Sequence, residues 1–108
     1  QSTLCRKVES YVDAHLTEKI TGTAIAEALG FSRSYLSSQF KKESGINLSD
    51  FINEVKIKEA CRLLVSSKRS IADIADSLAF SSQSYFQVLF KKQTGLTPAA
   101  YRERQKTN

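Results

Sequence analysis

The sequence contains no methionine, one histidine and two cysteines in 108 residues. Because no residue can serve as the initiator methionine, we expect the chain to be a domain excised from a longer protein. Cys5 and Cys61 lie far apart, and together with His15 they supply too few ligands for a four-coordinate zinc site. We interpret the cysteines as buried or inert thiols and His15 as a surface residue, and we expect no metal and no cofactor.

Long hydrophobic runs are also missing from the sequence. No apolar stretch approaches the roughly 18 residues that a membrane span needs. Residues 1–7 lack the hydrophobic segment of a signal peptide. The sequence therefore predicts a cytoplasmic location and no membrane partner.

Sequence motifs typical of enzyme active sites are absent as well. The sequence has no Gly-x-Ser-x-Gly motif, no glycine-rich phosphate loop and no carboxylate pair expected to face a common point. We therefore predict a protein that is not an enzyme.

Basic side chains, in contrast, are in excess. Lysine and arginine number 16 against 11 acidic residues, which gives a net charge of +5. This balance suits a polyanionic partner, although many other proteins are equally basic.

The most informative feature is an internal repeat. The segment 25–31 (Ile-Ala-Glu-Ala-Leu-Gly-Phe) returns at 74–80 (Ile-Ala-Asp-Ser-Leu-Ala-Phe), and the Phe-Lys-Lys of residues 40–42 returns at 90–92. A short helix, a tight turn and a second helix in each copy are typical of a helix-turn-helix unit. Two such units in one basic chain point to double-stranded DNA as the partner.

Apolar residues at intervals of three and four predict helices throughout, and no alternating strand pattern occurs. We expect an all-α, homeodomain-like fold of seven helices in one domain, residues 1–108. It has a first helix at about 3–16, a helix-turn-helix unit at about 22–45 and a connector helix at about 48–65. A second unit at about 70–95 and a last helix at about 98–104 follow, and the tail from Arg104 is expected to fray.

Polar residues that precede the helices are candidate N-caps. They are Thr23, Ser32, Asn47, Ser70 and Thr97, the last followed by Pro98. The repeated aromatic residues are expected in the core: Phe31, Tyr35, Phe40, Phe80, Tyr85 and Phe90. The connector helix is expected to carry Lys56, Lys58 and Arg62 on its polar side.

The early turns of each second helix carry polar side chains at matching places, where a recognition helix reaches base edges in the major groove. The candidate base-reading residues are Ser32, Arg33, Ser34, Ser37, Ser38, Ser82, Gln83, Ser84, Gln87 and Val88. A solvated helix face explains either set taken singly, but two sets in register favour DNA reading.

The chemistry of these side chains suggests what they read. Arg33 can pair with guanine, Gln83 or Gln87 with adenine, and Val88 can contact a thymine methyl group. The candidate phosphate contacts are Thr23, Lys41, Lys42, Arg62, Lys91 and Lys92. For each lysine at a helix end, compensation of the helix dipole is an equally good explanation.

Several motifs resemble the signature of the AraC/XylS family of bacterial transcription regulators. They are Lys56-Ile57 with Ala60 and Leu64, the run from Ile71 to Phe80, Phe86, Phe90-Lys91-Lys92, Gly95 and Thr97-Pro98, and they extend the resemblance over nearly the whole chain. The amino-acid sequence of the second unit is most similar to the C-terminal domains of YesN-type response regulators.

The resemblance implies two recognition helices in adjacent major grooves, with centres about 34 Å apart. It further implies a regulator, most often an activator, that contacts RNA polymerase and carries a sensor or receiver domain before this one. The sequence departs from the family in having Ala79 where glycine is common, and in having no Arg or Lys before Lys91 in the second recognition helix. The alternative function is a helix-turn-helix module that docks a protein without specific DNA binding.

Overall fold

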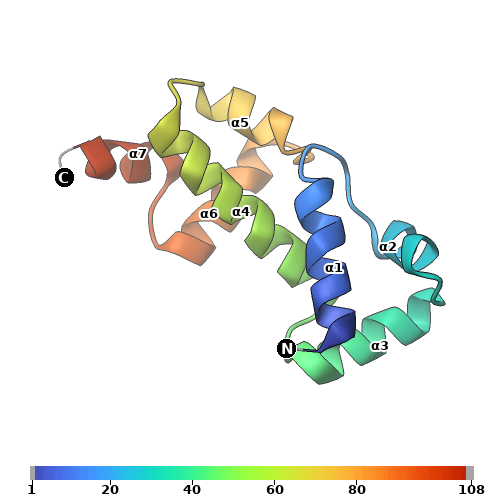
Figure 1. Ribbon diagram of the computed structural model, residues 1–108. Coiled ribbons are helices and arrows are strands. Elements are labelled where there is room, and N and C mark those ends of the chain that lie inside the picture. The colour runs from blue at the N-terminus through green and yellow to red at the C-terminus, as the bar shows by residue number, and fades with distance from the viewer. Residues whose placement is uncertain (1, 107–108) are drawn as a thin grey trace. The chain divides into compact units, whose positions relative to one another are not determined.

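The computed structural model describes residues 2–106, and this part of the chain contains seven α-helices and no strand (Figure 1). The helices are α1 (Thr3–Ala14), α2 (Gly22–Leu29), α3 (Arg33–Ser44), α4 (Leu48–Ser66), α5 (Ile71–Ser77), α6 (Gln83–Thr94) and α7 (Pro98–Lys106). The chain divides into two compact units at residues 55 and 56, within α4. The all-α prediction is confirmed.

The first unit is built around a core of mainly aliphatic side chains together with Phe40. Its buried residues come from α1, α2, α3 and the first half of α4: Cys5, Val8, Val12, Ile25, Ala26, Leu36, Phe40, Leu48 and Ile52. On α3 the buried residues are Leu36 and Phe40, four positions apart, so a single stripe of this helix faces the core. The rest of α3 is left for solvent.

The second unit has an aromatic core. The ring of Phe86 lies 5.0 Å from that of Phe80 and 5.7 Å from that of Phe90, centroid to centroid. Phe90 in turn meets the edge of Tyr101 on α7 at 5.5 Å. As in the first unit, two residues four positions apart, Phe86 and Phe90, anchor the recognition helix.

Most of the predicted N-caps are confirmed by hydrogen bonds. The side chains of Ser32, Asn47, Ser70 and Thr97 each accept a backbone N–H from the residue three positions later. The prediction for Thr23 is wrong, because Thr21 Oγ1 accepts the N–H of Ala24 at 3.1 Å and α2 begins at Gly22. Glycine disrupts a helix interior but fits its first turn, where the backbone is only partly committed.

The tight turn of each helix-turn-helix unit contains a residue with positive φ. Gly30 has φ 79° in the first unit, and Ala79 has φ 58° in the second. Alanine at this φ brings its Cβ close to the following carbonyl oxygen, which costs on the order of 1 kcal/mol. Ala79, which replaces the glycine common in the family, therefore strains the backbone of this turn.

The prediction that Lys56 lies on the polar side of the connector helix is wrong. Lys56 is 4% exposed, within the second unit, whereas Lys58 and Arg62 are exposed as expected. His15 was also predicted at the surface, but it ends α1 half-buried and stacks on Tyr11 with centroids 3.9 Å apart. The first helix accordingly ends at Ala14, earlier than predicted.

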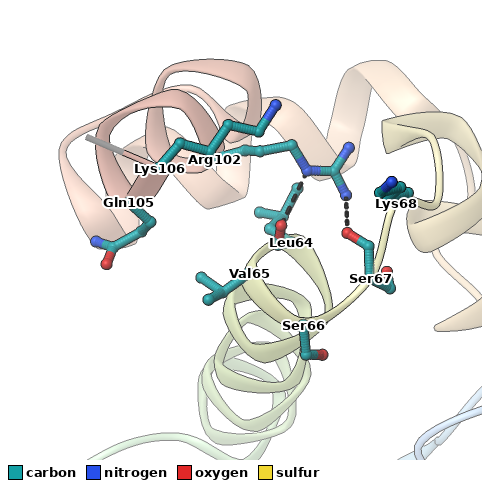
Figure 2. Close-up of a pocket in the computed structure, with 8 residues that line it drawn as sticks. All are labelled: Leu64, Val65, Ser66, Ser67, Lys68, Arg102, Gln105 and Lys106. Carbon is teal, nitrogen blue, oxygen red and sulfur yellow. Dashed lines mark hydrogen bonds between the residues drawn. The ribbon is translucent and has the colours of Figure 1, made fainter. Parts of the chain in front are cut away.

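Arg102 fastens α7 to the end of α4. Its Nε donates to Leu64 O at 2.9 Å, and its Nη2 donates to Ser67 O at 3.4 Å (Figure 2). Leu64 lies in the last turn of α4 and Ser67 directly follows this helix, so neither carbonyl has an intrahelical donor. The fraying predicted from Arg104 is wrong for residues 104–106, which continue α7, and residues 107–108 lie outside the described residues.

Candidate nucleic-acid interface

The predicted base-reading residues of the first unit lie at the N-cap and in the first two turns of α3. Ser32 Oγ is already used as an acceptor, because it caps the helix through the N–H of Tyr35 at 3.1 Å. Ser34 and Ser38 are exposed and Ser37 is half-buried. The short hydroxyl side chains leave the backbone of this face open to a close approach.

Arg33 lies across the start of α2. A Cβ placed on Gly22 would collide with the guanidinium of Arg33, and Arg33 Nη1 donates to Thr23 Oγ1 at 3.4 Å. Two predicted contacts, Arg33 and Thr23, are thereby brought together. Glycine at position 22 makes room for this arrangement, a role that the sequence pattern did not reveal.

The lysines at the end of α3 border a groove. It has a volume of about 670 Å³ and is lined by Arg33, Ser37, Ser38, Lys41, Lys42 and residues 47–50 at the start of α4. Lys41 and Lys42 are both exposed. Three predicted base-reading residues, Arg33, Ser37 and Ser38, thus share one groove with the two lysines, whereas Ser32, Ser34 and Thr23 do not line it.

The second unit repeats this arrangement with different chemistry. Ser82 Oγ caps α6, Gln83 and Ser84 are exposed, and Gln87 is half-buried. A hollow of about 440 Å³ is lined by Gln87, Val88, Lys91, Lys92 and Thr97. Because Val88 is 67% exposed, the middle of this face is apolar where the first unit has serines.

Arg62 differs from the other predicted phosphate contacts. Its Nε and Nη2 donate to the two carboxylate oxygens of Glu59, each at 2.7 Å. These bonds lower the pKa of Glu59 below its ordinary value. A phosphate must compete with this carboxylate, so Arg62 is a weaker candidate than the lysines.

Sequence reasoning missed two exposed tyrosines. Tyr35 and Tyr85 were predicted in the core, but they are 50% and 45% exposed. Each precedes the first buried residue of its recognition helix, which turns its side chain about 100° away from the buried stripe. The sequence contains this offset, but the prediction placed both tyrosines in the core because they are aromatic.

A further hollow lies in the second unit between the end of α4 and α7 (Figure 2). It has a volume of about 600 Å³ and is lined by Leu64, Val65, Ser66, Ser67, Lys68, Arg102, Gln105 and Lys106. Val65 is 57% exposed and is the large apolar residue of this surface. It belongs to neither recognition helix.

The thiols and acidic residues form no further site in the described residues. Cys5 is buried, and desolvation raises the pKa of the half-buried Cys61 thiol. Across residues 2–106 no three His, Cys, Asp or Glu side chains cluster closely enough to hold a metal ion. No helix in this part of the chain is both long and apolar enough to cross a membrane.

Two units that each combine a short helix, a tight turn and a helix with an exposed polar face define a helix-turn-helix protein. A family model described as "Helix-turn-helix domain" matches residues 25–104. The chain belongs to this family of AraC-type transcription regulators and is a sequence-specific DNA-binding domain. The predicted AraC resemblance is confirmed.

Among its relatives is the bifunctional transcriptional activator and DNA repair enzyme AdaA of Bacillus subtilis. The two are 35% identical over 99 residues, which cover 92% of this chain and 47% of AdaA. The chain therefore spans about half the length of this relative.

Solved structures agree with the sequence match. The C-terminal domain of the response regulator yesN from Fusobacterium nucleatum is 29% identical, with a TM-score of 0.85 over 94% of this chain and 99% of that one. The DNA-binding domain of AdpA, solved in complex with a target DNA, is 25% identical, with a TM-score of 0.89 over 98% of this chain and 96% of that one. The seven-helix fold thus occurs in a DNA-bound protein.

Proposed function

We propose that α3 and α6 enter adjacent major grooves and together read one asymmetric site in a bacterial promoter. The observation that carries this proposal is the repeated surface itself. Each recognition helix buries one stripe, exposes a polar or small-residue face, and ends in two exposed lysines, Lys41 and Lys42 or Lys91 and Lys92. A repeated surface of this kind fits a repeated polyanionic groove.

The two helices are proposed to read different bases. In the first unit Arg33 donates to guanine O6 and N7, with the serines at positions 32, 34, 37 and 38 beside it. In the second unit Gln83 or Gln87 pairs with adenine and Val88 contacts a thymine methyl group, with Ser82 and Ser84 nearby. The exposed apolar surface of Val88 supports this assignment.

Phosphate contacts are assigned to Lys41, Lys42, Lys91 and Lys92, with smaller contributions from Thr23 and Arg62. The lysines are exposed and lie at the border of the base-reading surface. Thr23 and Arg62 already bond to Arg33 and Glu59. To bind a phosphate, Thr23 and Arg62 must therefore exchange these protein partners for a phosphate oxygen.

The partners beyond DNA are also proposals. In a longer protein the chain follows a sensor or receiver domain and contacts RNA polymerase, and the protein acts in the cytoplasm without catalysing a reaction. The similarity to yesN, a two-component response regulator, supports a receiver domain. The hollow that contains Val65 supports a protein contact, because it exposes this large apolar side chain and none of its lining residues belongs to α3 or α6.

Selection of the purified chain against random duplex DNA tests this function, with affinities of the winners measured at two salt concentrations. We expect an enriched asymmetric site with two contacted segments about one helical turn apart. Salt-sensitive binding with no enriched sequence would contradict base reading by these helices. Absence of binding at both salt concentrations would favour the alternative, a helix-turn-helix module that docks a protein.

A further inference from the structure

Tyr35 and Tyr85 occupy equivalent places in the two units. Each is the third residue of its recognition helix, and its N–H donates to the serine that caps the helix, at 3.1 Å from Ser32 and 3.0 Å from Ser82. Both tyrosines therefore lie in the first helical turn, at the positive end of the helix dipole. This end of a helix favours a negatively charged ligand.

The rings of both tyrosines are braced from within their own unit. Tyr35 contacts Phe31 with centroids 5.2 Å apart, and Tyr85 contacts Phe80 with centroids 6.4 Å apart. About half of each residue nevertheless remains exposed. A braced ring loses little rotamer freedom when its hydroxyl group is bound, which lowers the cost of a contact.

Exposure of this kind is uncommon in the part of the chain that the structure describes. The large apolar side chains found exposed there are Tyr35, Val65, Tyr85 and Val88. Three of these four are on recognition helices, where Val88 already has a proposed thymine contact. Core packing does not explain the exposed half of the two tyrosines, whereas contact with a ligand of the recognition helices does.

Comparison of the units indicates which part of DNA the tyrosines meet. The proposed base readers with the most base-specific chemistry differ between the units, with Arg33 in one against Gln83 and Val88 in the other, whereas the serines at positions 32 and 34 recur at 82 and 84. The tyrosine is the same in both. Residues that differ suit bases that differ, whereas a shared residue suits the sugar-phosphate backbone, which is alike in both half-sites.

We propose that the phenol hydroxyls of Tyr35 and Tyr85 each donate a hydrogen bond to a phosphate oxygen, one in each half of the site. This inference rests on the proposed binding of DNA by α3 and α6. A tyrosine hydroxyl is a neutral donor, so these two contacts fix the depth and register of the helices without adding charge. They differ in this from the lysines, whose contacts release counterions.

The substitutions Tyr35→Phe and Tyr85→Phe test this role, because they remove only the hydroxyl group. Binding is measured on the selected site and on an unrelated duplex, at two or more salt concentrations, and the control is Tyr11→Phe in α1. Each test variant is expected to bind both duplexes roughly tenfold more weakly, which is the size of one hydrogen bond to a charged group, with an unchanged salt slope. The control and the thermal midpoints should stay as in the unmodified chain.

A second measurement identifies the phosphate directly. Single phosphates of the selected site are replaced by neutral methylphosphonate, and binding of the unmodified chain and of each variant is compared. One position should weaken the unmodified chain but cause no further loss in Tyr35→Phe, and another should behave in this way for Tyr85→Phe.

The outcomes separate this inference from the proposed function. If the unmodified chain binds DNA and both variants bind equally well, the tyrosines are not anchors and the inference is overturned. A loss that depends on one base pair would make the tyrosine a base reader and would overturn it as well. If the unmodified chain binds no DNA, the proposed function itself fails.

Discussion

Lys56 Nζ donates a hydrogen bond of 2.6 Å to the backbone oxygen of Leu78, the residue that ends α5. The same ammonium group lies 5.9 Å from the centroid of Phe80. Between these two partners is Ala79, with φ 58°. A buried lysine thus supports the strained turn that sets the direction of the second recognition helix.

Replacing Lys56 should therefore loosen this turn. We expect Lys56→Met to lower the free energy of unfolding by about 1–3 kcal/mol, since the buried Leu78 carbonyl loses a donor. Urea denaturation followed by circular dichroism measures the change. The matched control is Lys58→Met, two residues along the same helix and exposed, for which a change within about 0.5 kcal/mol is expected. Equal losses in both variants would show that the bond to Leu78 is unimportant.

Ala79→Gly should have the opposite effect. Glycine reaches positive φ without steric cost, and we expect the free energy of unfolding to rise by up to about 1 kcal/mol, partly offset by the greater freedom of glycine in the unfolded chain. The control is Ala72→Gly, in the exposed first turn of α5 and at negative φ, where glycine relieves no strain and should lower the free energy of unfolding. If Ala79→Gly is destabilising to the same extent, the strain assigned to this turn is absent.

Arg33 and Lys42 are predicted to contribute to DNA binding in different ways. Arg33→Ala should cost about 1–3 kcal/mol on the selected site and relax the preference at one base pair. Lys42→Ala should weaken binding to all duplexes and reduce the slope of log affinity against log salt by about one unit. Titrations of both variants on matched and mismatched duplexes at several salt concentrations distinguish the two effects. Equal losses on every sequence would contradict the division into a base reader and a phosphate contact.

Val88 is predicted to recognise a thymine methyl group. Replacing thymine by deoxyuridine at the contacted position removes only that methyl group, and it should weaken binding of the unmodified chain by about 1 kcal/mol, as expected for one buried methylene-sized group. Val88→Ala should bind the two duplexes equally. An undiminished preference for thymine in Val88→Ala would exclude this contact.

The sequence by itself determined the class of this fold and the place of its helices. Local features predict the helices and their ends, because each acts over only one or two helical turns. Examples are the Phe-Lys-Lys repeats, the capping residues Ser32 and Ser70, and the glycine at position 30. For the same reason the boundaries of α3, Arg33–Ser44, agree with the periodicity.

Contacts between residues far apart in the sequence determine where several polar side chains lie. Lys56 is buried because its ammonium group donates a hydrogen bond to a carbonyl 22 positions away. Tyr35 and Tyr85, in contrast, are exposed because the adjacent Leu36 and Phe86 fill the cores beside them. Hydrogen bonds also join Arg33 to Thr23, and Arg102 to the carbonyls of Leu64 and Ser67. The contacts of Lys56, Arg33 and Arg102 depend on residues that are distant in sequence and meet only when the chain has folded, so no local pattern encodes them.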